Sequence, residues 1–257
     1  MGTETGSGLW NPATVLLSSD GQWRLSAAAM AQNTDVPLSA QLGSVAGVWR
    51  HTTLALTVAR AGVSGLLRTD SDPLGVGGDI PYSTLVLSAI AARRLTPHII
   101  VGVAIRSRNG RLDDVSRTGV ATDAGVLAEH LTALDVRVGA STFLFSPWSR
   151  SAERTSLLIG TDARLFGSDS SRTVRAGYAF QQTQALSTEH YLFAMARWGP
   201  WEVRGGPVQT QIYGDSNWRS RLGIAVHHDG YAVAVSREAS VNGLLPTYHF
   251  SLSAVVR

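Results

Sequence analysis

The most regular feature of the sequence is an alternation of apolar and polar residues with a period of two. In the last segment, 247–257, Tyr248 and Phe250 lie on one face, and His249 and Ser251 lie on the other. Successive side chains of a β-strand point to opposite faces, so this pattern predicts strands that separate an apolar surface from a polar one.

Segments of this kind recur along the whole chain at the length expected for tilted membrane strands. We count about fourteen candidate strands, which begin near residues 22, 39, 52, 82, 98, 118, 132, 154, 172, 188, 201, 217, 230 and 246. The longest apolar runs, "TLVLSAIAA" and "IIVGVAI", are much shorter than the roughly 18 residues that a membrane-spanning helix needs. The sequence therefore predicts an all-β fold: a transmembrane antiparallel β-barrel of about fourteen strands with a short N-terminal plug segment.

The connections between the candidate strands alternate in length through the first half of the chain. "RH" and "HLT" are short, whereas "GVSGLLRTDSDPLGVGGDI" and "NGRLDDVSRT" are long. Short periplasmic turns and longer outer loops are typical of outer-membrane barrels. An even number of strands places both ends of the chain on the periplasmic side.

Aromatic residues gather at the predicted strand ends, as expected for the two interfaces of a membrane. The periplasmic ends carry Trp23, Trp49, Trp198, Trp201 and Tyr231, and the outer ends carry Tyr82, Phe143, Trp148, Phe180, Tyr191, Tyr213, Trp218 and Tyr248. In a soluble β-sandwich the same residues would be core residues at strand ends. A sandwich of this length usually has more Lys and Glu on its surface, which favours the membrane barrel.

The composition agrees with a surface that is largely withdrawn from water. Of the 257 residues, 16% are charged, against roughly 25% in typical soluble domains. The basic residues are all arginines, scattered singly along the chain, and the net charge is +3, which argues against a nucleic-acid partner. The absence of cysteine excludes a disulfide framework, a thiolate zinc site and a cysteine nucleophile.

No signal peptide is visible after Met1, so the chain is either cytosolic or a mature or trimmed form. Together with the strand pattern, this leads us to expect a bacterial outer-membrane protein in its mature form. Membrane lipids are then its first expected partner.

Three stretches resemble the FadL-like superfamily of outer-membrane proteins, and most closely its PorV/PorQ type. They are "GLWNPA", then "IIVGVAIRSRNGRLDDVSRTGVATDAGVLAEH", in which Asp123 and Gly125 complete an Ala-x-Asp-x-Gly strand, and the closing "TYHFSLSAVVR". The resemblance implies a fourteen-stranded barrel. It also implies either transport of hydrophobic compounds or a role in type IX secretion with protein partners.

Charged residues of both signs fall on the face that we assign to the lumen. The candidate site residues are Arg106, Arg108, Asp123, Asp135, Arg137, Asp162, Arg164, Arg175, Arg204, Arg219 and Arg221, and Arg24, Glu129 and Glu202 share this face. They form either a salt-bridged filling that stiffens the wall or a charged path for a substrate. The sequence leaves both readings open.

We find no arrangement that predicts an enzyme, a metal site or a cofactor site. The pairs His249 with Ser251 and His130 with Asp123 lack a third orienting group and an oxyanion donor set. The adjacent pair "HH" at 227–228 would point to opposite sides of an extended strand.

We divide the chain into a plug or hatch segment, 1–21, and a barrel, 22–257. In the plug, Asn11-Pro12 predicts a turn, and Trp10 belongs to the apolar residues that pack against the barrel. Three functions follow: diffusion of small, hydrophobic molecules through the lumen, anchoring of secreted or envelope proteins as in PorV, or a closed structural barrel. An apolar pocket near the plug favours transport, whereas a filled lumen with an exposed outer platform favours a protein partner.

Overall fold

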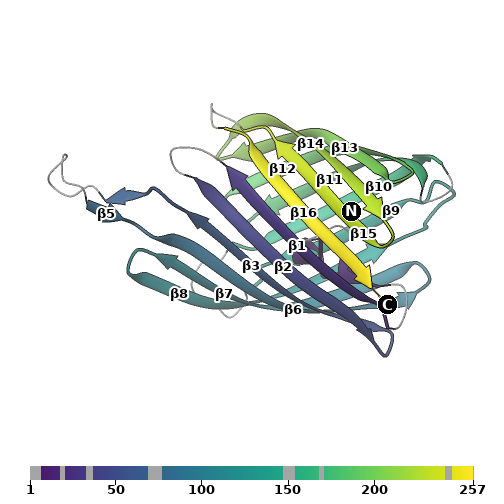
Figure 1. Ribbon diagram of the computed structural model, residues 1–257, viewed down its shortest axis with the longest axis horizontal. Coiled ribbons are helices and arrows are strands. Elements are labelled where there is room, and N and C mark those ends of the chain that lie inside the picture. The colour runs from purple at the N-terminus through teal and green to yellow at the C-terminus, as the bar shows by residue number, and fades with distance from the viewer. Residues whose placement is uncertain are drawn as a thin grey trace.

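The computed structural model describes residues 7–17, 21–32, 37–68, 77–146, 154–167, 171–240 and 245–256. Fourteen strands close into one antiparallel barrel, and β4 and β5 form a separate two-stranded hairpin (Figure 1). Two short helical turns precede the first strand: α1, Ser7–Trp10, and the 3-10 turn η1, Pro12–Val15. Among the described residues no helix is long and apolar enough to cross a bilayer.

Most strands of the barrel follow one another in sequence and pair with their neighbours, and β1 closes the ring by pairing with β16 from Trp23 opposite Val256 to Gln32 opposite Thr247. The strands are β1 Trp23–Gln32, β2 Leu38–Trp49, β3 Thr52–Val63, β4 Leu67–Arg68, β5 Gly77–Asp79, β6 Tyr82–Thr96, β7 Ile99–Leu112, β8 Val115–Ala128, β9 Arg137–Phe143, β10 Ser156–Phe166, β11 Arg172–Thr183, β12 Ser187–Trp198, β13 Trp201–Ile212, β14 Asp215–His228, β15 Tyr231–Glu238 and β16 Thr247–Val256. The predicted fold class and number of strands are confirmed.

The barrel wall is apolar outside and polar or small inside, the reverse of a soluble domain. Two adjacent residues of β7 show this: the outward side chain of Ile105 is 63% exposed, whereas the inward side chain of Arg106 is fully buried. Leu56 on β3, also 63% exposed, belongs to the same outer surface. Apolar area in water costs about 25 cal/mol per Å², so a wall covered with such residues requires a lipid environment.

The aromatic residues predicted for the periplasmic strand ends lie together at one rim, which we call the periplasmic rim. Trp23, Trp49, Trp198, Trp201 and Tyr231 are all more than half exposed at the strand ends of one rim. The guanidinium groups of Arg50 and Arg172 lie over the rings of Trp49 and Trp198.

At the opposite rim the prediction is only partly right. Tyr82, Tyr213, Trp218 and Tyr248 are exposed there. Phe143 and Tyr191 instead point into the lumen, where they contact Trp10 and Glu189. Trp148 lies outside the described residues.

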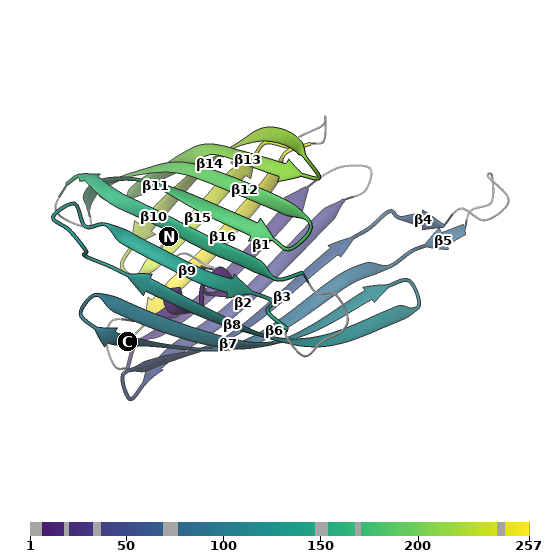
Figure 2. The ribbon, with the colours of Figure 1, turned by 180° about the vertical axis from the view of Figure 1, so that it is seen from behind.

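Two predicted connections are wrong. The strand expected near residue 132 begins at Arg137, because 129–136 is an irregular periplasmic connection in which Leu134 is exposed. Conversely, the predicted long loop "NGRLDDVSRT" is mostly strand, and β7 and β8 are joined by the tight turn Asp113-Asp114. β6, β7 and β8 are long strands of 15, 14 and 14 residues, and they extend past their neighbours at one side of the barrel (Figures 1 and 2).

Candidate functional site

Residues 7–17, which we call the seated segment, lie inside the barrel against the lumen face of β6, β7 and β8 (Figure 2). The Asn11 side chain holds the turn: its Oδ1 accepts a hydrogen bond from the amide of Ala13 at 3.0 Å, and its Nδ2 donates to the carbonyl of Val126 at 3.2 Å. Pro12 occupies the first position of η1, where its missing N–H has no cost. The predicted Asn-Pro turn is therefore present, and it is attached directly to β8.

Where this turn touches the barrel wall, the wall residues are glycines, which have no side chain. Gly102 of β7 and Gly125 of β8 are directly opposite each other in the strand pairing, and both face the lumen. A Cβ on Gly102 would overlap the backbone of Pro12, and a Cβ on Gly125 would overlap the side-chain oxygen of Asn11. The two glycines therefore form the seat of the Asn11-Pro12 turn.

Arg106 connects the seated segment to three strands. Its Nη2 donates to the carbonyl of Leu9 at 2.6 Å, its Nη1 donates to Ser88 Oγ at 2.9 Å, and its Nε donates to the carboxylate of Asp123. Arg106 and Asp123 are both fully withdrawn from solvent at their side chains. A buried ion pair of this kind is stable only when the remaining N–H donors of the arginine are also hydrogen-bonded. The Leu9 carbonyl and Ser88 Oγ accept these hydrogen bonds from Arg106.

Trp10 adds a second attachment on β9. Its ring lies against Phe143 with centroids 4.8 Å apart, and its carbonyl accepts a hydrogen bond from Ser141 Oγ at 2.8 Å. The guanidinium group of Arg106 also lies over the Phe143 ring, 5.1 Å from its centroid. Sequence reasoning missed Phe143 as a site residue and placed it at the outer interface.

Beneath the seated segment the lumen wall is apolar. Val15 and Leu17 pack on a group of inward side chains from β2, β3, β6 and β7. That group comprises Ala46, Val48, Ala55, Ile90, Ala92 and Ala104. A second group joins Ala13 to Ile100 and Leu127, with Leu16 packed beside it. An apolar lumen surface thus exists next to the predicted plug, as the transport hypothesis requires.

Five of the predicted site residues meet at the periplasmic end of β9, β10 and β11. Arg175 donates to Asp135 Oδ2 at 2.6 Å, to the Asp135 carbonyl at 2.7 Å and to Asp162 Oδ1 at 2.5 Å. Arg137 donates to Asp162 at 2.8 Å, and Arg164 lies 3.8 Å from Asp135. These contacts fasten the irregular connection 129–136 to the wall.

Asp135 belongs to that connection and lies outside the membrane-spanning strands. Burial alone would raise the pKa of its carboxyl group, but hydrogen bonds and Coulomb attraction from Arg175 and His130 outweigh burial and lower the pKa below its ordinary value. The carboxylate therefore stays charged, and the connection stays fastened, at neutral pH.

A third group of charges lies in the outer half of the lumen. Arg219 donates to Glu189 at 2.8 Å, to Glu238 at 2.5 Å and to Thr210, while Arg221 donates to the other oxygen of Glu238 at 2.5 Å. Sequence reasoning identified the two arginines but missed Glu189 and Glu238. The signal that could have identified the two glutamates is their place at inward positions in the period-two pattern of β12 and β15.

The two remaining predicted residues belong to none of these groups. Arg108 lies on β7 two residues beyond Arg106, on the same lumen side. Arg204 lies on β13, 4.0 Å from Glu202, which in turn contacts His227 at 3.1 Å. No cluster of three or more His, Cys, Asp and Glu side chains suited to a metal ion is found in the described part of the chain.

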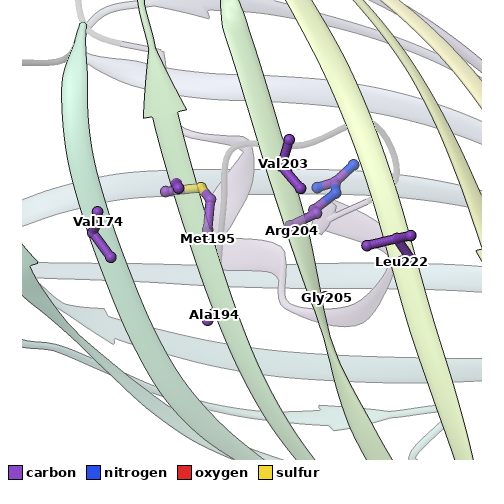
Figure 3. Close-up of a pocket in the computed structure, with 8 residues that line it drawn as sticks. Val174, Ala194, Met195, Val203, Arg204, Gly205 and Leu222 are labelled. Atoms are coloured by element: carbon purple, nitrogen blue, oxygen red, sulfur yellow. The ribbon is translucent and has the colours of Figure 1, made fainter.

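The wall opposite the seated segment carries a shallow hollow of about 260 Å³ between β11 and β14 (Figure 3). Its side chains Val174, Ala194, Val203 and Leu222 face outward, and the small Ala194 leaves the space. Nearby, Pro207 lacks the N–H that a β13 residue would give to the ladder. The lining of the hollow also includes Met195 and Arg204, which alternate onto the lumen face.

Comparison with known proteins matches this architecture to membrane channels. The fold resembles that of a TodX deletion mutant described as a monoaromatic hydrocarbon channel, with TM-score 0.68, 11% identity, and coverage of 97% of this chain and 92% of that one. It also resembles the toluene transporters TbuX of Ralstonia pickettii (TM-score 0.65, 12% identity, coverage 96% and 92%) and TodX of Pseudomonas putida (TM-score 0.57, 12% identity, coverage 97% and 92%). No protein-family model and no curated protein matches the sequence.

Fold and outer surface together define the class: this is a transmembrane β-barrel of the bacterial outer-membrane type, with an N-terminal segment seated in its lumen. Within that class, its fold is similar to those of the monoaromatic hydrocarbon channel and the toluene transporters just named.

Proposed function

We propose that the chain is an outer-membrane diffusion channel for small hydrophobic molecules and that the seated segment is its plug. One observation carries the proposal: the plug covers an apolar patch of the lumen wall, formed around Ile90, Ile100 and Leu127. A hydrophobic solute that replaces the plug on this patch regains the burial that the plug gives up, about 25 cal/mol per Å².

The polar groups around the patch suit a plug that leaves and returns. Hydrogen bonds with Arg106, Ser141 and Val126 attach the N-terminal half of the plug, and the Leu17 amide donates to Thr53 Oγ1 at 3.0 Å at its other end. Apolar pockets with a few fixed polar groups are typical of small-molecule sites. The names of the channels with similar folds, and the resemblance to FadL-like proteins, support the same substrate class.

Binding of a small hydrophobic probe tests the patch directly. The fluorescence of N-phenylnaphthylamine rises in apolar surroundings, so we expect stronger binding to a variant lacking residues 1–18 than to the intact chain. In that background, Ile90→Gln should weaken binding, whereas Ala28→Gln, on the lumen face of β1 and outside both apolar groups, should leave it unchanged. Equal binding by all four proteins would contradict the proposal.

A protein partner is the second candidate function, and the exposed edge of β8 favours it. β8 pairs with β9 only from Gly125 to Ala128, and the isolated bridge between Thr122 and Phe145 follows. Beyond it, the described residues provide no strand partner for 115–119, although β7 pairs along the other edge. Such an edge accepts an extended segment of a secreted or envelope protein by strand addition.

The variant Thr118→Pro removes an N–H from this edge, and Thr118→Val keeps it. If a protein partner adds a strand there, chemical cross-linking in cells should give a specific adduct with the wild type and with Thr118→Val, but not with Thr118→Pro. An adduct that survives Thr118→Pro, or no adduct at all, would remove this candidate.

A further inference from the structure

The seated segment covers only one side of the lumen. It packs on β6, β7 and β8, with smaller contacts to β3 and β9, and Val15 and Leu17 also reach Ala46 and Val48 of β2. Inward residues beneath it are withdrawn from solvent, as Ile90 (3% exposed) and Ala104 (2%) show. Inward residues of β1, β15 and β16, outside this contact area, such as Ala28, Ala234 and Ser251, remain partly exposed.

Solvent therefore reaches the interior of the barrel while the segment is in place. The uncovered wall carries a run of small inward side chains: Ala232, Ala234 and Ser236 of β15, and Ser251 and Ser253 of β16. Their polar and small character suits water better than an apolar solute.

The charges along this side are unequal at its two ends. In the outer half, Arg219 and Arg221 are balanced by Glu189 and Glu238. Among the described residues near the periplasmic end of β1, β12 and β13, Arg24, Arg197 and Arg204 face the lumen with one carboxylate, Glu202. Three arginines and one glutamate give a formal surplus of two positive charges there.

Arg24 contributes most directly to this surplus. It is inward on β1 and half-buried, and it lies at the edge of the covered area, opposite Ala46 of β2. It forms no ion pair with any other residue in the described ranges. Glu202, by contrast, already contacts His227 at 3.1 Å and lies 4.0 Å from Arg204. A passing anion would therefore meet a cation whose charge is not already neutralised.

We infer that the uncovered wall lines a standing aqueous path for small hydrophilic anions, selected at the periplasmic end by Arg24 and Arg204. Arginines that line a pore favour anions because their field raises the local anion concentration. This path does not require the plug to move, so it is distinct from the proposed route for hydrophobic molecules.

Ion currents through the intact chain in planar bilayers test the inference, with potassium chloride as the probe. We expect a steady conductance, and in a salt gradient a reversal potential of the sign set by chloride. The double variant Arg24→Gln/Arg204→Gln should lower the chloride-over-potassium permeability ratio by at least about fivefold, the factor that a single unit charge about 4 Å from one ion gives in water. The control Arg237→Gln, on the lipid side of β15, should leave the ratio unchanged.

The position of the path is tested by two tryptophan substitutions on one strand. Ala234→Trp points into the lumen and should reduce the conductance, whereas its neighbour Val233→Trp points to lipid and should not. Far-UV circular dichroism and the heat-dependent gel mobility of barrels show that each variant is folded. Absence of conductance in folded protein, a preference for potassium, or an unchanged conductance in Ala234→Trp would overturn the inference.

The experiments test the hydrophobic route and the anion path independently of each other. If N-phenylnaphthylamine does not bind the patch but the anion current persists, only the proposed hydrophobic route is wrong. If the probe binds and the chloride current is absent, only the aqueous path is wrong.

Discussion

Gly102 and Gly125 face each other across the β7–β8 pairing and together form the space into which the Asn11-Pro12 turn fits. Adding one methyl group to either glycine should displace the turn without disturbing the strands, because a β-strand readily accommodates alanine. Overpacking typically costs about 1–3 kcal/mol. Here we expect this cost to weaken the binding of the seated segment to the lumen wall and not the folding of the barrel.

We therefore expect Gly125→Ala to increase the rate of chymotrypsin cleavage after Trp10 by about tenfold or more, the factor that about 1.4 kcal/mol gives. Gly43→Ala is the matched control, because its Cβ would lie 3.5 Å from Val58, an ordinary contact. Equal cleavage rates in both variants would show that the glycines are not the seat.

Replacing Arg106 should destabilise the barrel more than removing the whole ion pair. Arg106→Met leaves the buried carboxylate of Asp123 without its cation, which costs about 3–5 kcal/mol. The double variant Arg106→Met/Asp123→Leu removes both charges and should recover most of that loss. Urea unfolding in lipid vesicles measures both, and equal loss in the single and double variants would contradict a coupled pair.

The connection 129–136 should loosen in acid. Because the folded-state pKa of Asp135 lies below its ordinary value of 3.8, the contacts of Asp135 stabilise the fold above that value and are lost as the pH falls through the lower, folded-state value. We expect Asp135→Asn to lower the melting temperature at pH 7, with a difference that shrinks below about pH 4. Asp229→Asn, in an exposed turn at the same rim, is the control. A difference that is independent of pH would exclude this role of the carboxylate.

A charged substitution on the outer surface distinguishes a membrane barrel from a soluble one. Leu56→Arg places a charge on the most exposed part of β3, which a soluble protein would tolerate. In a bilayer the same change costs about 2–4 kcal/mol near the midplane. Ser26→Arg, directed into the lumen, should cost much less in the same refolding assay into lipid vesicles. Similar costs for the two variants would contradict the assignment of the outer face.

The strand order and the direction of the side chains were predictable because a membrane wall imposes a period of two on every strand. That signal ends where a strand leaves the bilayer. Beyond Ser107, both faces of the β7–β8 hairpin contact water, so the sequence there is polar on both sides and reads as a loop. In the opposite case, Leu134 and Val136 alternate like strand residues but belong to an irregular connection.

The candidate site was predictable in residue type but not in its contacts. Alternation alone assigns Arg106, Asp123 and Arg175 to the lumen, where charges are expected. Which carboxylate meets which arginine depends on the tilt of the strands and on residues far apart in sequence, as for Arg219 with Glu238. The seat of the plug required the register that sets Gly102 opposite Gly125, and nothing in the local sequence of either strand contains that register.

The central claim is that the seated segment controls access of hydrophobic molecules to an apolar lumen wall. The most direct measurement is the rate of N-phenylnaphthylamine uptake across the outer membrane of Gram-negative cells that express equal amounts of folded protein. We expect uptake with the intact chain to exceed that of cells without it, and the variant lacking residues 1–18 to be faster still. Uptake that is the same in all three would contradict the account.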